Sequence, residues 1–287
     1  MTLLLLAQLL PLRRQRDIKE VLGYYLATGS VDLAYDVEIH RLAAKLTAGS
    51  RFQGRVNTRT PPTDGYLNIY VLRADPAHMF GEVDCNCAYI GSDVILCDSK
   101  FVASFTATLN FPQDPEVAIL QDVNKSFGRF LLAWLLGHEI GHAQLHYSSL
   151  SHARWRWDRL DAQAWKLSQE READEYVIAH LPIEDPRRAS FTLLNLVFQI
   201  YSRAYAYNRS HGVHLTGGRI LIHRSRYATH DPWVFRALTM AEVLERHSSL
   251  TRGDSDFSSS LRSKFVVSNE GYEVGALCDG AKLRVTR

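Results

Sequence analysis

The chain has 287 residues, which is enough for one large domain or two small ones with a substantial core. A hydrophobic fraction of 46% and a charged fraction of 22% are ordinary for a soluble globular protein. The 33 lysines and arginines nearly balance the 31 aspartates and glutamates, so the overall charge gives no sign of a nucleic-acid partner or an acidic one. Twelve histidines are many for this length, which justifies a search for metal-ligand spacing.

The chain begins with a short apolar run in the sequence MTLLLLAQLLPLRR. A run of about nine residues is too short to span a bilayer. Its arginines follow the run rather than precede it, and no small-residue cleavage site is present, so it does not match a secretory signal. We expect an N-terminal helix packed on the core, with a weak membrane-surface anchor as the alternative. We therefore expect a cytoplasmic protein without stable membrane insertion.

The first third of the chain mixes helical and strand patterns. Residues 17–50 look helical, with one break where Gly29 and Ser30 could end one helix and cap the next, and a polar loop follows at 58–65. Residues 66–72 alternate well enough for a strand. Residues 88–97 form two short apolar runs around a Gly-Ser-Asp sequence, which indicates a hairpin or a bulged edge strand.

The remainder of the chain is mainly helical in pattern. A helix start signal precedes residue 115, and the helical pattern continues to about residue 147. Three further helical segments are expected at about 158–181, 187–206 and 232–247. The tail after residue 248 is rich in Ser, Gly and Asp and gives no clear pattern. A small β region followed by a run of helices predicts an α+β fold.

These patterns suggest three segments within what we expect to be one compact unit. Residues 1–60 would be an N-terminal helical segment, residues 61–250 the main domain, and residues 251–287 a C-terminal tail packed on it. The oligomeric state cannot be inferred from these patterns.

Four cysteines are present, at positions 85, 87, 97 and 278. Cys85 and Cys87 are separated by a single residue, which matches no common zinc or redox spacing. We expect these cysteines to be structural or at the surface. A disulfide or a second metal site is the alternative.

The long helix expected at 115–147 contains the sequence His138-Glu139-Ile-Gly-His142. Residues four apart lie on the same face of a helix, so both imidazoles can reach one metal ion, and Glu139 can contact a metal-bound water. The preceding residues 127–136 are apolar on nearly all sides, which indicates a helix inside the core. Burying polar side chains there requires a compensating partner, and a metal would supply one. The alternative is two histidines beside a chance glutamate.

A catalytic zinc site needs a third protein ligand and one open position. His146 follows His142 by four residues, but three ligands along one helix would span about 12 Å, too far for one ion. In the helix expected at 158–181, Glu170 and Asp174 begin an otherwise apolar face. Glu170 could therefore bind the metal, while Asp174 accepts a hydrogen bond from a ligand histidine. Glu172, on another face, is the second candidate, and a solvated acidic helix start is the alternative without a metal.

The sequence HEIGH followed by EREAD resembles the HExxH and ExxAD motifs of gluzincin zinc peptidases, the group of HtpX and the CAAX prenyl proteases. In that family the first glutamate of ExxAD binds zinc, which the resemblance assigns to Glu170. Residues 229–236 resemble the family's Thr-His-Pro and Arg segment, with Asp231 inserted before the proline. The resemblance places His230 and Arg236 near the active site. It covers residues 86–240, and the soluble Lit-type phage-exclusion peptidases are the more similar branch because transmembrane helices are missing here.

The expected fold is thus α+β and zincin-like, with a small β-sheet packed on an active-site helix and a mostly helical C-terminal half. We expect one Zn²⁺ per chain, bound by His138, His142 and Glu170. Glu139 would act as general base, and His230 would stabilise the oxyanion. Asp174 and Arg236 would support these groups from behind.

The expected function is that of a zinc-dependent endopeptidase acting on a protein or peptide substrate. The substrate would dock in extended form against the edge strand near 88–97. Two alternatives remain: a non-catalytic zinc protein with a regulatory or interaction role, and a metal hydrolase that does not cleave peptides. A structural zinc site would be closed by a fourth protein ligand, so an open coordination position distinguishes the first two possibilities.

Overall fold

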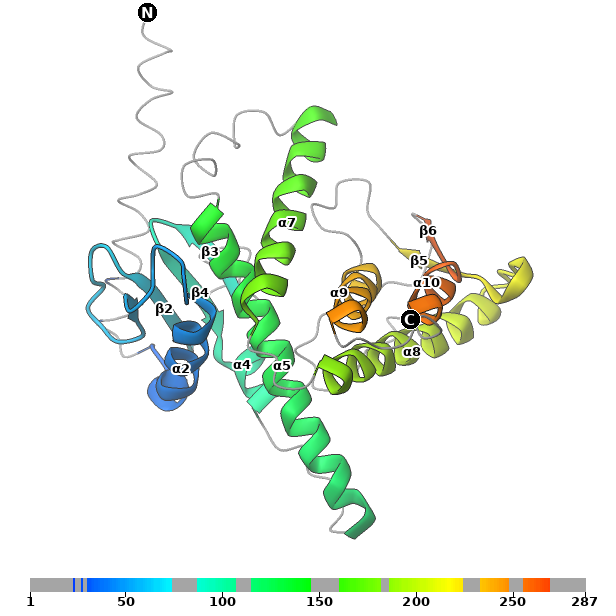
Figure 1. Cartoon of the computed structure of the whole chain (residues 1–287), viewed down its shortest axis with the longest axis horizontal. Coiled ribbons are helices and arrows are strands. Elements are labelled where there is room, and N and C mark those ends of the chain that lie inside the picture. The colour runs from blue at the N-terminus through cyan, green and yellow to red at the C-terminus, as the bar shows by residue number, and fades with distance from the viewer. Residues whose placement is uncertain are drawn as a thin grey trace, which may run out of the picture.

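The computed structural model of the chain describes residues 30–73, 87–106, 115–145, 160–181, 186–223, 233–247 and 255–268, besides positions 23 and 27. The first half of the chain contributes a small sheet with adjoining helices, and the second half is mainly helical (Figure 1). This arrangement of a small mixed sheet and several helices agrees with the expected α+β class. Within the described residues, no helix is long and apolar enough to cross a membrane.

The main sheet has four strands in the order β1-β2-β4-β3. Its strands are β1 (Val56–Asn57), β2 (Leu67–Leu72), β3 (Cys87–Gly91) and β4 (Val94–Asp98). Strands β1, β2 and β4 run parallel, whereas β3 is antiparallel to β4 and lies at one edge. All side chains of β2 and β4 are buried, because the sheet has apolar clusters on both faces.

The expected strand at 66–72 is β2, and residues 88–97 form a hairpin whose register shifts between Tyr89 and Gly91. Ser92 and Asp93 make the turn with positive φ angles of 53° and 59°. A guanidinium N–H of Arg51 donates to Asp93 at 2.7 Å. The hairpin turn is thereby tied to the loop that precedes β1.

A disulfide joins Cys87 on β3 to Cys97 on β4. For these two cysteines the alternative expectation, a disulfide, is therefore confirmed. The cysteines at positions 85 and 278 lie outside the described residues. Disulfides are uncommon in a reducing cytosol, so this bond lends no support to the expected cytoplasmic location.

The break expected at Gly29–Ser30 agrees with the non-helical Ser30, but the helical prediction is wrong at residues 31–32, which are extended. Asp32 N–H donates to the carbonyl of Val71, and Val31 forms an antiparallel bridge with Leu72, so this segment extends the sheet. The next helical elements along the chain are the 3₁₀ turn η1 (Leu33–Tyr35) and α2 (Asp36–Leu46). Backbone pairing with a distant strand overrides the local helical pattern here.

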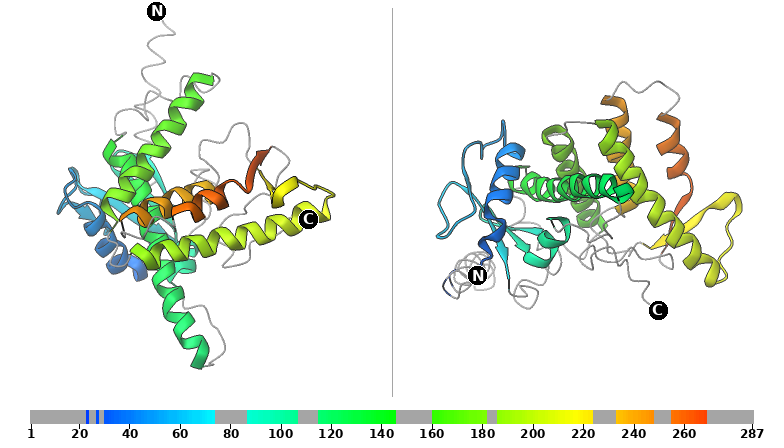
Figure 2. Two further views of the ribbon diagram at one scale, coloured as in Figure 1. Left: turned by 45° about the vertical axis from the view of Figure 1, so that its right-hand side comes forward. Right: turned by 90° about the horizontal axis from the view of Figure 1, so that it is seen from below.

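The expected helices of the second half are present as α5 (Pro115–Leu145), α7 (Leu160–His180), α8 (Pro186–Ser210) and α9 (Trp233–His247). Several shorter elements went unrecognised in the sequence, besides the 3₁₀ turn η3 (Thr216–Gly218). They are β1, α4 (Ser99–Thr106), α10 (Ser255–Arg262) and the parallel strands β5 (Ile220–His223) and β6 (Phe265–Ser268). Figure 2 shows α8, α9 and α10 gathered on the side of the molecule opposite the main sheet.

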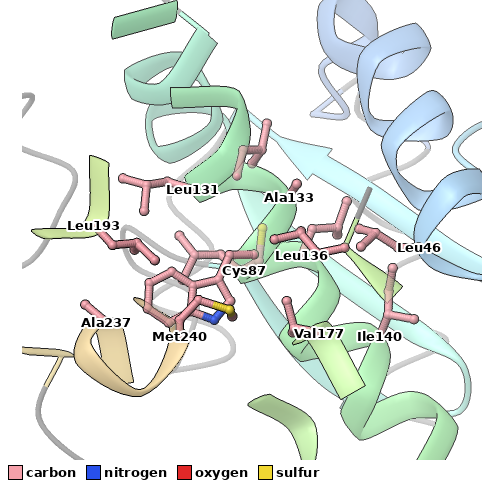
Figure 3. Packing of buried hydrophobic residues seen from close by; sticks show 14 of the residues in the cluster. Leu46, Cys87, Leu131, Ala133, Leu136, Ile140, Val177, Leu193, Ala237 and Met240 are labelled. Atoms are coloured by element: carbon pink, nitrogen blue, oxygen red, sulfur yellow. The ribbon is translucent and has the colours of Figure 1, made fainter. Parts of the chain in front are cut away.

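Helix α5 is the central element of the fold. Its residues 131–138 and 140–143 are all buried, and it contacts α2, α4, α7, β3 and β4. Figure 3 shows Leu136 and Ile140 of α5 among side chains from α2 and α7, including Leu46 and Val177. The expectation from sequence that this helix runs through the core is confirmed.

Helices α5 and α7 approach each other most closely at Gly141. A Cβ atom at this position would lie 3.0 Å from the Cα of Ala173 and 3.1 Å from its carbonyl oxygen. Ala173 itself is fully buried. Only a residue without a side chain fits at Gly141 with these backbones in place, so this contact sets the distance between the two helices.

We therefore expect Gly141→Ala to push α7 away from α5 by a few tenths of an ångström and to destabilise the protein by about 1–3 kcal/mol, as overpacking does. Gly137→Ala is the matched control. Its Cβ would meet only the side-chain methyls of Leu46 and Val177, at 3.2 and 3.3 Å, and such groups can move. Thermal unfolding of both variants checks this, and equal losses for the two glycines would contradict the account of the crossing.

Candidate metal centre

Two helices bring the candidate ligands together. His138 and His142 lie one turn apart on α5, near its C-terminal end, and Glu170 comes from α7. Both histidines are buried, with 3% and 8% of their surfaces exposed. Glu170 can reach them because Gly141 and Ala173 let α7 pass directly over this part of α5.

The three donor atoms form a compact triangle. Nε2 of His138 lies 2.9 Å from Oε2 of Glu170, and Nε2 of His142 lies 3.2 Å from the same oxygen. The two imidazole Nε2 atoms are 3.1 Å apart. Two of these contacts join nitrogens to a carboxylate, but the third joins two ring nitrogens, between which only one proton can fit.

The donor set fits a zinc-type ion. Ligand atoms at about 2.0–2.1 Å from a tetrahedral zinc are about 3.3 Å from one another, close to the separations of this triangle. Two imidazoles and one carboxylate also match the ligand types of catalytic zinc sites. His138, His142 and Glu170 can therefore hold one metal ion together. The geometry does not fix which metal it is, because imidazole also suits iron, copper and nickel.

Asp174 and Arg236 hold His138 in place through its Nδ1 atom, on the side of the ring away from the metal position. Oδ1 of Asp174 lies 3.0 Å from Nδ1 of His138, and Arg236 donates to both carboxylate oxygens of Asp174, at 2.6 and 2.8 Å. Nη2 of Arg236 also lies 3.0 Å from Nδ1 of His138. An arginine N–H cannot accept a hydrogen bond, so the protonated Nδ1 of His138 donates to Asp174 and not to Arg236. Nδ1 and Arg236 lie close together because both bind the carboxylate of Asp174. Nε2 is then directed at the metal position.

Opposing effects determine the protonation of His138. Burial and the charge of Arg236 lower its pKa, but hydrogen bonds to Asp174 and Glu170 and the charge of Glu139 outweigh them and raise the pKa to about 9. Burial raises the pKa of Asp174, and the contacts with His138 and Arg236 reverse this and hold it well below its ordinary value. Without a metal, the carboxylates are therefore neutralised by a proton on His138 and by Arg236. A metal cation would replace that proton.

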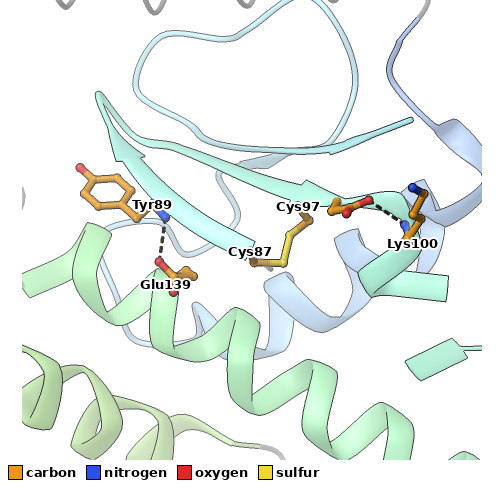
Figure 4. The surroundings of a disulfide bond; sticks show 6 residues. Cys87, Tyr89, Cys97, Lys100 and Glu139 are labelled. Carbon is orange, nitrogen blue, oxygen red and sulfur yellow. Dashed lines mark hydrogen bonds between the residues drawn. A yellow bond between two sulfur atoms is a disulfide. The ribbon is translucent and has the colours of Figure 1, made fainter. Parts of the chain in front are cut away.

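Glu139 does not belong to the ligand triangle. Its side chain turns toward the edge strand, where Oε2 accepts a hydrogen bond of 2.7 Å from the backbone N–H of Tyr89 (Figure 4). The same short strand carries Cys87, whose disulfide fixes β3 to β4. The candidate general base thus lies between the metal ligands and the edge of the sheet.

A cavity of about 420 Å³ lies beside Asp174 and Arg236. Its lining includes Trp134, Asp174 and Arg236 but none of the three candidate ligands. The guanidinium of Arg236 lies 5.7 Å from the ring centre of Trp134, so an aromatic face helps to hold it in place. The cavity therefore adjoins the residues behind His138 rather than the metal position.

The structure places most of the site residues expected from sequence. His138, His142, Glu170, Asp174 and Arg236 are in mutual contact. Glu172 is not part of this group, because it is exposed and accepts a hydrogen bond from Ser168 on the outer face of α7. His230 lies outside the described residues.

Sequence reasoning missed two residues that position the site. Tyr89 contributes only its backbone N–H, so no side-chain motif could reveal it. Arg51 donates to the carbonyl oxygen of Ala143 at 2.9 Å, next to His142, while it also binds Asp93. A single arginine thus links the hairpin turn to the ligand helix across long distances in sequence, and no local signal marks it.

We expect Glu170→Ala to weaken zinc binding about as severely as His138→Ala, because each change removes one of three ligands. Glu172→Ala is the matched control, two residues away on the same helix, and should leave zinc binding nearly unchanged. Zinc content by elemental analysis and competition with a chelator measure both effects. Loss of the metal in Glu172→Ala with retention in Glu170→Ala would reverse the assignment.

We also expect zinc binding to release about one proton near pH 7.5, because His138 with a pKa of about 9 is protonated in the metal-free protein. Since zinc and the proton compete, apparent zinc affinity should rise roughly tenfold per pH unit between pH 7 and 8.5. Titration calorimetry in buffers of different ionisation enthalpy measures the released proton. An affinity that is constant above pH 7 would show that His138 has an ordinary pKa.

Comparison of the chain with protein-family models, with curated proteins and with solved structures finds no match in any of the three. The resemblance to gluzincins therefore rests on the short motifs around Glu139 and Glu170. What the described residues support directly is a cluster of His138, His142 and Glu170 that can bind one metal ion.

Proposed function

We propose that the protein is a zinc-dependent endopeptidase. The observation that carries this proposal is the position of Glu139, whose carboxylate lies beside a His-His-Glu cluster and also reaches the edge strand of the sheet. A cluster that only stabilises the fold would not need an acidic group at that point. A general base, by contrast, must lie within reach of both the nucleophilic water and the substrate.

In this proposal His138, His142 and Glu170 hold the zinc. When bound, zinc would polarise the peptide carbonyl and lower the pKa of a water toward 7. Asp174 keeps the imidazole of His138 in the tautomer that presents Nε2. Arg236, bound to both oxygens of Asp174, holds that carboxylate in place.

Glu139 would accept a proton from the attacking water and later donate it to the leaving amine. The expected role of His230 as oxyanion donor stays a prediction, since this residue lies outside the described part of the chain. The proposed cycle needs no further acid among the described residues.

The edge strand β3 offers a docking surface for an extended substrate. In the part of the chain that the structure describes, β3 pairs on one side only, with β4. The N–H of Tyr89 points away from β4 toward Glu139, so the outer edge of β3 faces the site. A peptide added to this edge would form main-chain hydrogen bonds and pass close to Glu139.

The other candidate function is a non-catalytic zinc protein. Closed structural sites have four protein ligands. Among the described residues, no fourth His, Cys, Asp or Glu joins His138, His142 and Glu170. This favours a site with an open coordination position, and therefore an enzyme over a non-catalytic zinc protein.

The test compares the wild-type protein with Glu139→Gln, after loading both with zinc. We expect Glu139→Gln to retain about one zinc per chain and to lose turnover by several orders of magnitude, because only the proton carrier is removed. Cleavage is measured with a proteome-derived peptide library, read by mass spectrometry of new N-termini. Glu172→Gln serves as the control on an exposed glutamate.

Near-normal cleavage by Glu139→Gln would overturn the mechanism. If zinc-loaded wild type and Glu139→Gln gave identical peptide profiles without any cleavage, the non-catalytic alternative would be preferred.

A further inference from the structure

The near balance of charge in the whole chain conceals a strongly basic segment. Residues 186–230 contain seven arginines and no lysine, aspartate or glutamate. This segment covers all of α8, the turn η3 and the strand β5. The rest of the chain is therefore net acidic, and positive charge is concentrated in one part of the sequence.

Helix α8 has apolar residues on two sides. One side packs into the core through Leu193, Val197, Ile200 and Ala204, all of them fully or nearly fully buried. Figure 1 shows α8 running outward from the centre of the molecule, with α9 against it. A helix of a soluble protein usually carries polar residues on the side that faces away from the core.

The side of α8 away from the core instead carries three aromatic residues spaced seven apart. Phe191, Phe198 and Tyr205 have 64%, 47% and 46% of their surfaces exposed. Seven residues are about two helical turns, so the three side chains form one line about 21 Å long. Tyr205 also stacks on Tyr201, with ring centres 6.3 Å apart.

Positive charge continues this aromatic line. Arg209 follows Tyr205 by four residues, so it lies on the same side of α8, and it is exposed. Arg219 is exposed just after the turn η3. Within the described ranges, no carboxylate forms an ion pair with Arg209 or Arg219. We call the surface formed by Phe191, Phe198, Tyr205, Arg209 and Arg219 the α8 face.

The charge pattern disfavours a symmetric contact in which two α8 faces pack on each other. Helix α8 carries four arginines and no acidic residue. Two α8 helices packed together would bring like charges together and offer them no carboxylate, and such pairs repel. A partner with anionic groups would complement these arginines.

The spacing of the aromatics decides between anionic partners. Adjacent exposed rings lie about 10.5 Å apart along the helix, which suits isolated insertions rather than stacking on successive bases of a nucleic acid. A bilayer interface imposes no such spacing. Phenylalanine and tyrosine side chains insert between its lipid headgroups, and arginines bind the headgroup phosphates.

We propose that the α8 face is a peripheral docking surface for membranes rich in anionic phospholipid. Phe191, Phe198 and Tyr205 would insert at the level of the headgroups, while Arg209 and Arg219 pair with lipid phosphates. The helix lies on the membrane and does not cross it, since its other side is part of the protein core. This inference does not depend on the metal site or on hydrolysis.

The test is co-sedimentation of the full-length protein with vesicles of phosphatidylcholine alone or with 30% phosphatidylglycerol. We expect binding to the anionic vesicles only, with most of it lost in 0.5 M salt as the Debye length shrinks. Equal binding to both vesicle types, or binding to neither, would overturn the proposal.

Two sets of variants locate the bound surface. Phe191→Ser with Phe198→Ser should weaken binding roughly tenfold or more, because apolar insertion is lost. The matched control is Leu33→Ser with Val37→Ser, two apolar residues exposed by 59% and 75% on another part of the fold. Circular dichroism and thermal unfolding establish that each variant is folded.

Arg209→Gln with Arg219→Gln should weaken binding about 25-fold, from about fivefold per arginine near an anionic surface. Arg41→Gln with Arg55→Gln is the control at two exposed arginines elsewhere. Unchanged binding in both α8 double variants would place the contact elsewhere, for example in the apolar N-terminal run, and would contradict the proposal. The proposal would also be contradicted if the protein bound a single-stranded oligonucleotide but no vesicles, and if these variants abolished the oligonucleotide binding.

Discussion

The backbone contact between Gly141 and Ala173 is the constraint on which the rest of the site depends. It lets α5 and α7 approach so closely that a Cβ atom at Gly141 would meet backbone at 3.0 Å. The candidate ligands and the aspartate that supports them lie next to this contact in sequence, either adjacent to it or one turn before it. Glu170 meets the two imidazoles of α5 on one side of His138, and Asp174 meets that ring on its other side. The spacing between two helices thus determines whether three ligands form one site.

The edge of the sheet is fixed to the same ligand helix by polar contacts. Glu139 accepts from the backbone of Tyr89, and Arg51 bridges the hairpin turn and the carbonyl of Ala143. These bonds hold the hairpin against the ligand helix, next to the edge where an extended peptide would dock in the proposed function. They imply that edge strand, base and ligands keep a constant geometry, because each is held by groups from a different element.

The parts predictable from sequence were those with a local signal. The long buried helix, the pair of histidines one turn apart and the shared helical face of Glu170 and Asp174 all follow from a period of 3.6 residues. The extended segment at 30–32, the parallel pair β5 and β6, and the contact of Glu139 with a backbone N–H do not. Each depends on pairing between residues far apart in the chain, and periodicity and spacing report only on residues close in sequence. The basic segment 186–230 was missed for another reason, since net charge averages over the whole chain.

The central claim is that two imidazoles and one carboxylate bind a single zinc and leave one position for water. X-ray absorption spectroscopy of the zinc-loaded wild-type protein tests it most directly, because the fine structure reports the number and type of ligand atoms. The account requires two imidazole nitrogens and one or two oxygens at about 2.0–2.2 Å, without sulfur. A spectrum that shows sulfur ligands, or four protein nitrogens around the metal, would contradict it.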